Sequence, residues 1–454
     1  MTAPMIRHVA IIGAGFSGAL QAINLLRHEG PRATLIERRP QAGRGVAYSA
    51  AHASHLLNVR ASNMSALPDD PGHFVRWLAA RGQGDGGSFV PRIVYGEYLA
   101  GLLDEALARA PDRLRLIHAD VEDLKVDGGG ATLHLAGGDR IAADAAVLAV
   151  GNLPPHPPHG LDPALIGPDR YSADPWAASL ADGLGDDDTV VVIGTGLTMV
   201  DVALLLDARG FKGRILAISR RGLLPRAHVA GGTVSTALSE RPSIEASALL
   251  REVRERADAI GWRPTVDEMR PFTQGMWLAA DAAQRQRFLR HLRPWWDVHR
   301  HRLAPAVAER IAALRAEGRL QIAAGKTIAF DPTPGGVAMR WRPRGAEAVE
   351  TLIARRVVNC SGPMVDLDRT TEPLLRRLRD DGTIRPDSCR IGIDVDVRAH
   401  VIRGDGRRHD RLFALGPMTR GAFWEIVAVP DIRVQTWSLA RTLSNAHWVG
   451  GEGL

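Results

Sequence analysis

The sequence predicts an α/β fold in which one pattern of elements occurs twice. First, an apolar strand runs into a glycine turn and then a helix, at residues 9–18 and again at 190–199. Second, each half continues through a glycine-containing hairpin to an apolar strand that ends at a glycine, Gly151 in the first half and Gly362 in the second. This duplicated order predicts two Rossmann-like dinucleotide-binding domains with β-meander crossovers.

The length of the chain, 454 residues, is too great for one hydrophobic core. The first domain is expected to be discontinuous, with residues 1–155 and 355–454, and the second is expected at 165–350. The proline-rich residues 153–160 between them are a candidate hinge. A helical insertion is predicted at about 227–320. The insertion covers the nicotinamide, roofs a substrate pocket, or only forms an extra helical layer around its tryptophans, Trp262, Trp277, Trp295 and Trp296.

The first glycine turn predicts a site for a dinucleotide pyrophosphate. Gly13 allows the tight turn, Gly15 lets the pyrophosphate approach the backbone, and Gly18 lets the helix pack closely on its strand. Glu37 ends the next strand, nineteen residues after Gly18, and can accept hydrogen bonds from ribose hydroxyls. FAD or NAD suits this end. The expected site also includes Phe16, Ser17, Arg38 and Arg44.

The second glycine turn predicts a different nucleotide. Its partner strand, residues 213–219, ends at Ser219 and is followed by Arg220 and Arg221. Two guanidinium groups favour a 2′-phosphate, so NADPH is expected rather than NADH, unless these arginines are only solvated surface charges. Met199 replaces the usual third small residue, which implies looser or shifted helix packing. The other expected residues are Gly194, Gly196 and Thr198, with Arg226 and His228 as candidates for reaching the NADPH phosphates.

Composition narrows the function classes. The formal net charge of +6 is mild, and no basic run with interleaved aromatics argues for nucleic acid. Cys360 and Cys389 are the only cysteines, which excludes a disulfide framework and a Cys-x-x-Cys redox pair and favours a cytoplasmic setting. No membrane span and no metal site are expected, since His299 and His301 point to different helix faces. A homo-oligomer is left open.

Several strings resemble one family of flavoproteins. Besides the paired glycine turns, they lie at residues 55–60, 66–77, 89–98 and 412–433. Together the chain resembles the FAD-NAD(P)-binding family typified by bacterial YdhS-like proteins, among the two-dinucleotide-binding-domain flavoproteins. The resemblance implies FAD in the first domain and NADPH in the second.

The resemblance also implies positions beside the flavin. Asn58, Arg60, Asn63 and Met64 lie in the segment that usually passes the isoalloxazine, where they bind flavin edges or a carboxylated substrate, or satisfy the loop backbone. Glu425 is expected near a helix start whose amides stabilise negative charge at flavin N1 and O2, or is an ordinary first-turn carboxylate. Gly151, Gly362, Gly416 and Trp424 complete the expected cofactor-binding set.

The implied reaction is oxidation or oxygenation. The family is similar to flavin monooxygenases that hydroxylate amines or amino acids, in which NADPH reduces the flavin and O₂ then gives a C4a-(hydro)peroxide. No catalytic residue is assigned, and the expected substrate is a small amine or amino acid. Residues 171–176 read Tyr-Ser-Ala-Asp-Pro-Trp and lack the Phe-x-Gly-x-x-x-His-x-x-x-Trp string of Baeyer–Villiger enzymes. The alternatives are an NADPH reductase that passes electrons to a quinone, a small acceptor or a protein partner, and a non-catalytic NADPH sensor.

Overall fold

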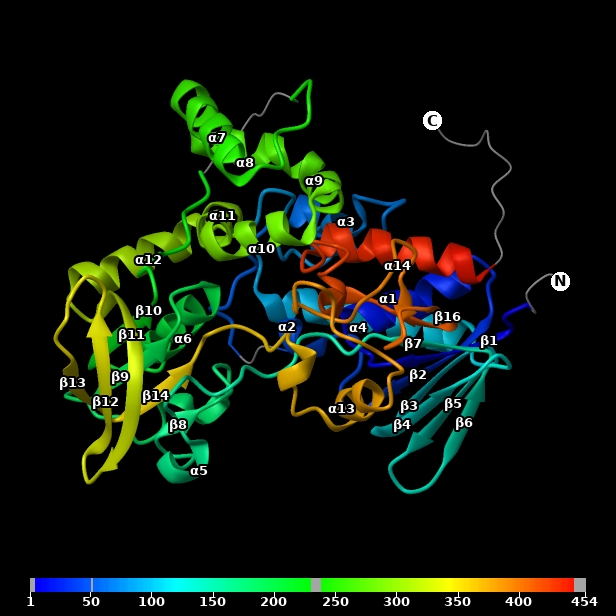
Figure 1. The fold of residues 1–454 in the computed structure, drawn as a ribbon, viewed down its shortest axis with the longest axis horizontal. Helices are drawn as coiled ribbons and strands as arrows, with labels where there is room; N and C mark the ends of the chain where they lie inside the picture. Colours follow the sequence, from blue (N-terminus) through cyan, green and yellow to red (C-terminus); the bar gives the residue numbers. More distant parts are fainter. Residues whose placement is uncertain (1–4, 50–51, 230–237, 445–454) are drawn as a thin grey trace.

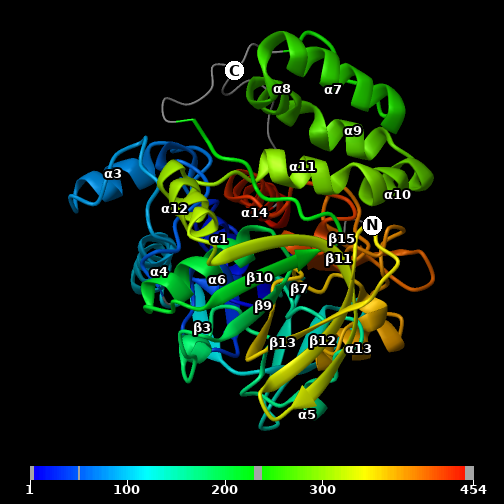
Figure 2. The ribbon, with the colours of Figure 1, turned by 90° about the vertical axis from the view of Figure 1, so that its left-hand side faces the viewer.

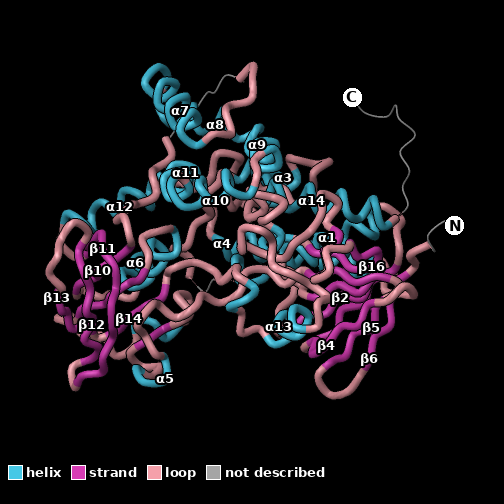
Figure 3. The backbone as a smooth tube through the Cα atoms, in the orientation of Figure 1, coloured by secondary structure: helices cyan, strands magenta, loops and turns pink. Residues whose placement is uncertain are grey.

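The computed structural model describes residues 5–49, 52–229 and 238–444 and contains two large, separate sheets whose central strands are parallel and whose edges include antiparallel strands (Figure 1 and Figure 3). The first sheet has six strands in the order β15-β16-β7-β1-β2-β3. Its strands are β1 (His8–Ile12), β2 (Arg32–Glu37), β3 (Leu114–His118), β7 (Ala145–Leu148), β15 (His400–Ile402) and β16 (Arg408–Ala414). Residues 9–11 of β1 are fully buried, as expected for a central parallel strand. The predicted α/β fold is confirmed.

The second sheet has seven strands in the order β13-β12-β11-β10-β9-β14-β8. They are β8 (Tyr171–Ser172), β9 (Thr189–Ile193), β10 (Arg214–Ser219), β11 (Leu320–Thr333), β12 (Gly336–Pro343), β13 (Glu350–Ala354) and β14 (Arg356–Asn359). The expected return of the chain to the first domain at 355 is too early, because Arg356 pairs with Val190 of β9 and Val357 pairs with Tyr171 of β8. The chain therefore leaves the second sheet only after Asn359.

Each half carries a β-meander. In the first half it is a separate sheet of β4 (Val121–Val126), β5 (Ala131–Leu135) and β6 (Arg140–Ala143). The Asp127 carboxylate fixes the turn between β4 and β5 by accepting from the amides of Gly129 and Gly130, at 2.7 and 3.1 Å. In the second half, β11 pairs in parallel with β10 at its start and antiparallel with β12 at its end. Both predicted hairpins are present.

Helices α1 (Phe16–Arg27) and α6 (Leu197–Ala208) follow the two glycine turns, and most of their residues are buried. In the first half, α1 packs against α14 (Val429–Leu443) and α4 (Arg92–Arg109). The remaining helices of this half are α2 (Gly45–Tyr48), α3 (His73–Ala79) and α13 (Pro373–Asp380). In the second half, α5 (Pro163–Ile166) precedes β8, and α12 (Pro305–Ala316) packs on α6 and leads into β11.

The predicted insertion is helical where the structure describes it. It comprises α7 (Ala246–Ile260), α8 (Trp262–Met269), α9 (Thr273–Ala279), α10 (Ala282–His291) and α11 (Arg293–Arg300). Two perpendicular views place these helices as one group beside α14 of the first half (Figure 1 and Figure 2). Within the described ranges, no helix is both long and apolar enough to cross a bilayer.

Candidate active site

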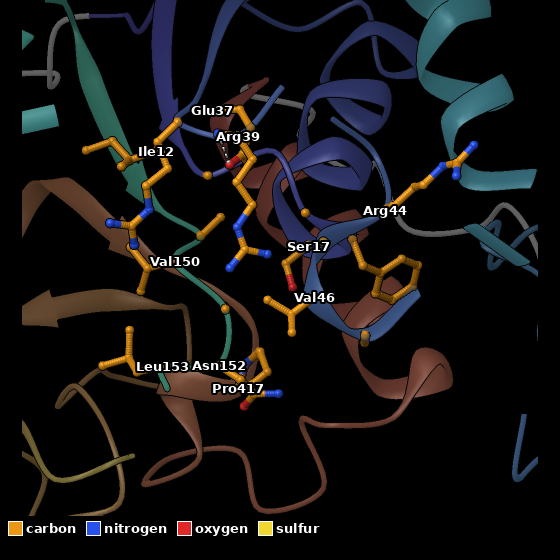
Figure 4. Close-up of a pocket in the computed structure, with 18 of the residues that line it drawn as sticks. Ile12, Ser17, Glu37, Arg39, Arg44, Val46, Val150, Asn152, Leu153 and Pro417 are labelled. Carbon is orange, nitrogen blue, oxygen red and sulfur yellow. Dashed lines mark hydrogen bonds between the residues drawn. The ribbon is translucent and has the colours of Figure 1, made fainter. Parts of the chain in front are cut away.

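A cavity of about 490 Å³ lies at the carboxyl ends of the first sheet (Figure 4). It is lined by the ends of β1 and β2, by the glycine turn, by residues 44–49 and by residues 149–154. The end of a parallel sheet is where nucleotides bind in this class of fold. Of the residues predicted from the sequence, those that line the cavity are Gly13, Gly15, Phe16, Ser17, Glu37, Arg38, Arg44 and Gly151.

The glycine turn is built as the sequence predicts. Gly13 has φ +99°, and a Cβ there would lie 2.5 Å from the Ala149 carbonyl oxygen, so only glycine fits without a shift. A Cβ on Gly18 would collide with the Gly13 carbonyl, which explains the close packing of α1. A Cβ on Gly15 would lie 3.4 Å from the Cα of Gly45. The turn thus keeps a narrow space between two glycine backbones.

The start of α1 offers free amides to this space. Its N-cap is Gly15, and no side chain caps the helix, so the first amides have no intrahelical partner. Ser17 points into the cavity beside Val46 (Figure 4). Free amides at a helix N-terminus together with a glycine approach fit a pyrophosphate. The donor set and the space therefore fit FAD.

Glu37 lies at one end of this cavity. One carboxylate oxygen accepts from the Ala14 amide at 2.8 Å, and the other accepts from the Arg39 amide at 3.0 Å. Each carboxylate oxygen can accept a second hydrogen bond. The held carboxylate is thus suited to the two hydroxyls of a ribose.

Three arginines at this cavity differ in what they can do. Arg38 makes a bidentate ion pair with Glu372, at 2.8 and 3.1 Å, and this hydrogen bonding raises the pKa of the guanidinium. Arg44 extends away from the other labelled side chains (Figure 4). Arg39, which the sequence argument missed, extends between Val150 and Ser17 (Figure 4), and its guanidinium has no hydrogen bond or ion pair to any described residue. Its position two residues after Glu37 is the signal by which the sequence could have identified Arg39 as a site residue.

The far end of the cavity is largely apolar, and sequence reasoning did not identify its walls. They come from segments distant in the chain: Asn152, Leu153, Pro417, Val427 and Ile432. Gly416, which belongs to the expected cofactor-binding set, directly precedes Pro417 in the chain. Its φ is +75°, and a Cβ there would collide with the Ser17 hydroxyl. Gly416 therefore permits contact between the C-terminal segment and the glycine turn.

The residues expected beside the isoalloxazine lie outside this cavity. Asn58 and Arg60 face the second half of the molecule: the Asn58 carbonyl accepts from His228 at 3.0 Å, and Arg60 donates to the Val229 carbonyl at 2.8 Å. Asn63 is exposed, and Met64 is buried in the core around α3 and α4. The sequence around these residues does not show that the loop contacts the second half of the molecule.

Trp424 and Glu425 also lie outside it, against the helical insertion. Trp424 stacks on Trp277 with ring centroids 4.6 Å apart. The Glu425 carboxylate, buried, accepts from Trp296 Nε1 at 3.0 Å and pairs with Arg300 at 3.2 Å. Glu425 precedes α14 by four residues, so it is not a first-turn carboxylate.

The second glycine turn repeats the first. Gly194 has φ +117° and faces the Cys360 carbonyl, where a Cβ would collide. Gly196 is the N-cap of α6, is exposed, and has nothing near the position of a Cβ. Thr198 is half-buried in the first turn of α6, and Gly362, with φ +96°, likewise has nothing near the position of a Cβ. Met199 is fully buried in the core of this half. The uncapped helix start fits a second pyrophosphate.

The two arginines after β10 are not equivalent. Arg220 is exposed, whereas Arg221 donates to the carbonyls of Arg290 and His291 in the insertion, both at 3.3 Å. Ser219 is held by Thr195 at 2.8 Å and by the Gly222 amide at 3.0 Å. Arg226 is exposed, and His228 is used in the contact with Asn58. Arg220 is therefore the arginine best placed for a 2′-phosphate.

Comparison with known proteins agrees with this geometry. No curated protein matches the sequence. The L-lysine 6-monooxygenase from Pseudomonas syringae has a TM-score of 0.67 at 16% identity, over 97% of this chain and 99% of its own. The ornithine N-hydroxylase from Kutzneria sp. 744, solved with reduced FAD, NADP⁺ and L-ornithine, has 0.65 at 13%, over 98% and 100%. The thioredoxin reductase from T. acidophilum has 0.54 at 14%, over 97% and 99%.

The fold of the whole chain is thus the fold that these enzymes share. A more specific match covers the first half, where residues 10–153 match the family described as FAD-NAD(P)-binding. That segment contains the first glycine turn, Glu37 and most of the cavity wall. Residues 10–153 are accordingly similar to the FAD-NAD(P)-binding domains of that family.

Proposed function

We propose that this protein is an NADPH-dependent FAD oxidoreductase, and specifically a flavin monooxygenase that N-hydroxylates a small amine or amino acid. FAD occupies the cavity of the first half, formed by residues up to about 155 and by those after Asn359, and NADPH binds at the second glycine turn. The cavity between Glu37 and Pro417 is the observation that carries the proposal. It has a carboxylate at one end, free helix amides in the middle and apolar walls at the other end.

The protein's own groups have clear roles in this proposal. The amides at the start of α1 and the guanidinium of Arg39 bind the pyrophosphate of FAD, and Glu37 binds its ribose. Leu153, Val427 and Ile432 exclude water from the far end of the cavity. Arg220 binds the 2′-phosphate of NADPH. Bound FAD supplies the chemistry, since it accepts two electrons from NADPH and, when reduced, reacts with O₂.

The choice of an amine substrate rests on the shared fold. Two of the compared enzymes are named as an L-lysine 6-monooxygenase and an ornithine N-hydroxylase, and each aligns over nearly the whole length of both chains. In such a mechanism the cofactor performs the oxygenation, so the protein needs no catalytic acid or base. The sequence indicated no catalytic acid or base among the residues that line the cavity.

The test is the fate of NADPH electrons. The purified protein should be yellow with about one FAD per chain, and amines or amino acids should be screened for stimulation of NADPH oxidation. The expected result is one hydroxylated amine per NADPH for at least one substrate. A colourless protein that does not take up FAD would contradict the assignment of the first site.

A second candidate is an NADPH reductase, because a thioredoxin reductase shares the fold. Cys360 is buried, Cys389 is half-buried and both are free thiols, so electrons would go to a quinone, a small acceptor or a protein partner rather than to a disulfide. NADPH oxidation that yields only hydrogen peroxide, and that rises with an added quinone, would favour this candidate. Binding of NADPH without flavin reduction would instead favour a sensor.

A further inference from the structure

The carboxylate of Asp201 is buried where the two halves of the molecule contact each other. Asp201 lies on α6, five residues after Gly196, and its side chain is 5% exposed. A buried carboxylate is costly unless its charge and its hydrogen bonds are matched. Its partners therefore show what this position is built to hold.

The main partner comes from the other half of the molecule. Arg92 makes a bidentate ion pair with Asp201, with nitrogen–oxygen distances of 2.6 and 3.1 Å, and its side chain is 16% exposed. Trp176 Nε1 donates to the same carboxylate at 3.1 Å. His55 Nε2 donates to the Asp201 backbone carbonyl at 3.1 Å. Three separate segments thus converge on one residue of α6.

Arg92 in turn is tied to the wall of the FAD cavity. It is the first residue of α4, and its Nε donates to the Leu56 carbonyl at 3.3 Å. One turn further along, Gly96 lies directly against the Tyr48 carbonyl, where a Cβ would collide. Tyr48 lines the FAD cavity. Helix α4 therefore contacts the wall of the first site and also forms an ion pair with α6, the helix that begins at the second site.

Apolar packing surrounds this ion pair. Leu56 and Phe89, from the first half, pack against the core of the second half. Apolar contacts alone allow small slides, whereas a bidentate pair with planar groups fixes distance and angle. The buried pair is thus suited to set the register of the two halves.

We propose that the Arg92–Asp201 pair positions the NADPH domain on the FAD domain so that the nicotinamide meets the flavin at the distance that hydride transfer requires. This inference rests on the proposed function and adds residues to it. Both are positioning residues, since neither lines the FAD cavity. In the step concerned, NADPH would pass a hydride, one hydrogen with two electrons, to FAD, which would give NADP⁺ and FADH⁻. A misplacement of about 1 Å in such a step costs up to about 100-fold in rate.

The experiment is anaerobic stopped-flow reduction of the FAD-loaded full chain by NADPH, with Asp201→Asn as the variant. Asparagine has the same shape and loses the charge. The expected result is a reduction rate at saturating NADPH that falls by about 10- to 100-fold. FAD content and NADPH affinity should stay within about twofold of wild type, because the groups that bind both nucleotides are untouched. The deuterium isotope effect with 4-²H-NADPH should show that hydride transfer limits the variant.

Asp207→Asn is the matched control. Asp207 is on the same helix and is also ion-paired, with Arg310 at 2.7 Å and Arg319 at 2.9 Å, but its partners belong to its own half of the molecule. A loss of charge there should leave the rate of flavin reduction unchanged.

The outcomes separate this inference from the proposed function. If NADPH does not reduce the wild-type flavin, the proposed function is wrong. Only the positioning role is wrong if NADPH reduces the flavin of wild type and of Asp201→Asn at the same rate. The same holds if flavin reduction in Asp207→Asn is slowed as much as in Asp201→Asn. Should Asp201→Asn fail to fold, Arg92→Met with Asp201→Leu removes both charges and should fold, retain FAD and be reduced slowly. Reduction of this double variant at the wild-type rate, or loss of folding in both variants, would overturn the inference.

Discussion

At Gly15 the backbone needs space rather than an unusual conformation. Its φ of −71° is open to any residue, and a Cβ would meet only the Cα of Gly45 at 3.4 Å. A larger side chain would therefore fill the approach of the pyrophosphate without straining the turn. We predict that Gly15→Val lowers FAD affinity by at least about tenfold, or about 1.4 kcal/mol. The measurement is flavin absorbance per chain after purification, with Gly101→Ala, which meets nothing within 4 Å, as the control.

Arg220 and Arg221 allow a second prediction. Only Arg220 is exposed, since Arg221 is engaged with carbonyls of the insertion. Arg220→Ala should weaken NADPH binding by about 1 to 3 kcal/mol and leave NADH binding nearly unchanged, because it removes a charge-assisted contact to the 2′-phosphate. Arg221→Ala should have a smaller effect on this preference. Titration of each variant with both nucleotides tests it, and an unaltered NADPH preference in Arg220→Ala would refute the assignment.

Two histidines at the contact between the halves make stability depend on pH. Burial lowers the pKa of His55 and of His228 from 6.5, so both are neutral in the folded protein near pH 7. Below about pH 6.5 the unfolded chain binds more protons than the folded one, so stability falls as pH falls, by up to about 1.4 kcal/mol per pH unit for each histidine. Thermal melts between pH 7.5 and 5.0 should show this loss. His228→Gln, which keeps a donor for the Asn58 carbonyl, should show less of it.

Among the elements, those specified by neighbouring residues were the ones the sequence could predict. The glycine turns follow from positions that favour glycine, either by a positive φ, as at Gly13, or by lack of space, and the first hairpin follows from the Asp127 carboxylate that caps its own turn. The C-terminal segment depends instead on distant contacts, so Glu425 was expected at the flavin yet pairs with Arg300. The repeated order of elements gave the strand at 356–359 to the second half, whereas the boundary expected at 355 cut it off, and its pairing with β9 places it in the second sheet.

The insertion makes a testable element of its own. Trp277 is 5% exposed, stacks on Trp424 and donates from Nε1 to the Gly421 carbonyl at 2.8 Å. Trp277→Ala should weaken the docking of α9 and α10 on the C-terminal segment by about 3 to 5 kcal/mol. Hydrogen exchange of residues 273–291 should accelerate. Trp295→Ala, at a tryptophan that is 44% exposed, should leave the exchange unchanged.

For the whole molecule, the FAD cavity links segments from β1 to α14, so bound FAD should stabilise the first half as a unit. Free FAD at 100 times its dissociation constant should add about 2.7 kcal/mol to the free energy of unfolding. The melting temperature of protein stripped of flavin should therefore rise with FAD concentration and approach that of the untreated protein. Glu37→Gln should require more FAD for the same rise, because the amide is a weaker acceptor for the ribose hydroxyls.

At this scale the sequence predicted two nucleotide sites, but it could not predict how they face each other. The walls at the far end of the cavity and the ion pair between Arg92 and Asp201 join residues more than a hundred positions apart. Asp201 is the single charged residue in the apolar run 197–206, which indicates a buried charge, but nothing near it in the chain identifies Arg92 as its partner. Such contacts depend on the arrangement of complete domains.

The docking of α7–α11 has a practical consequence. In the chain these helices lie between β10 and β11 of the second sheet. They nevertheless pack against residues 421–431, which belong with the first sheet. A recombinant fragment cut between the two sheets would present Trp277 and Trp424 to water. Such fragments should aggregate, so expression of either half by itself is a poor route to its chemistry.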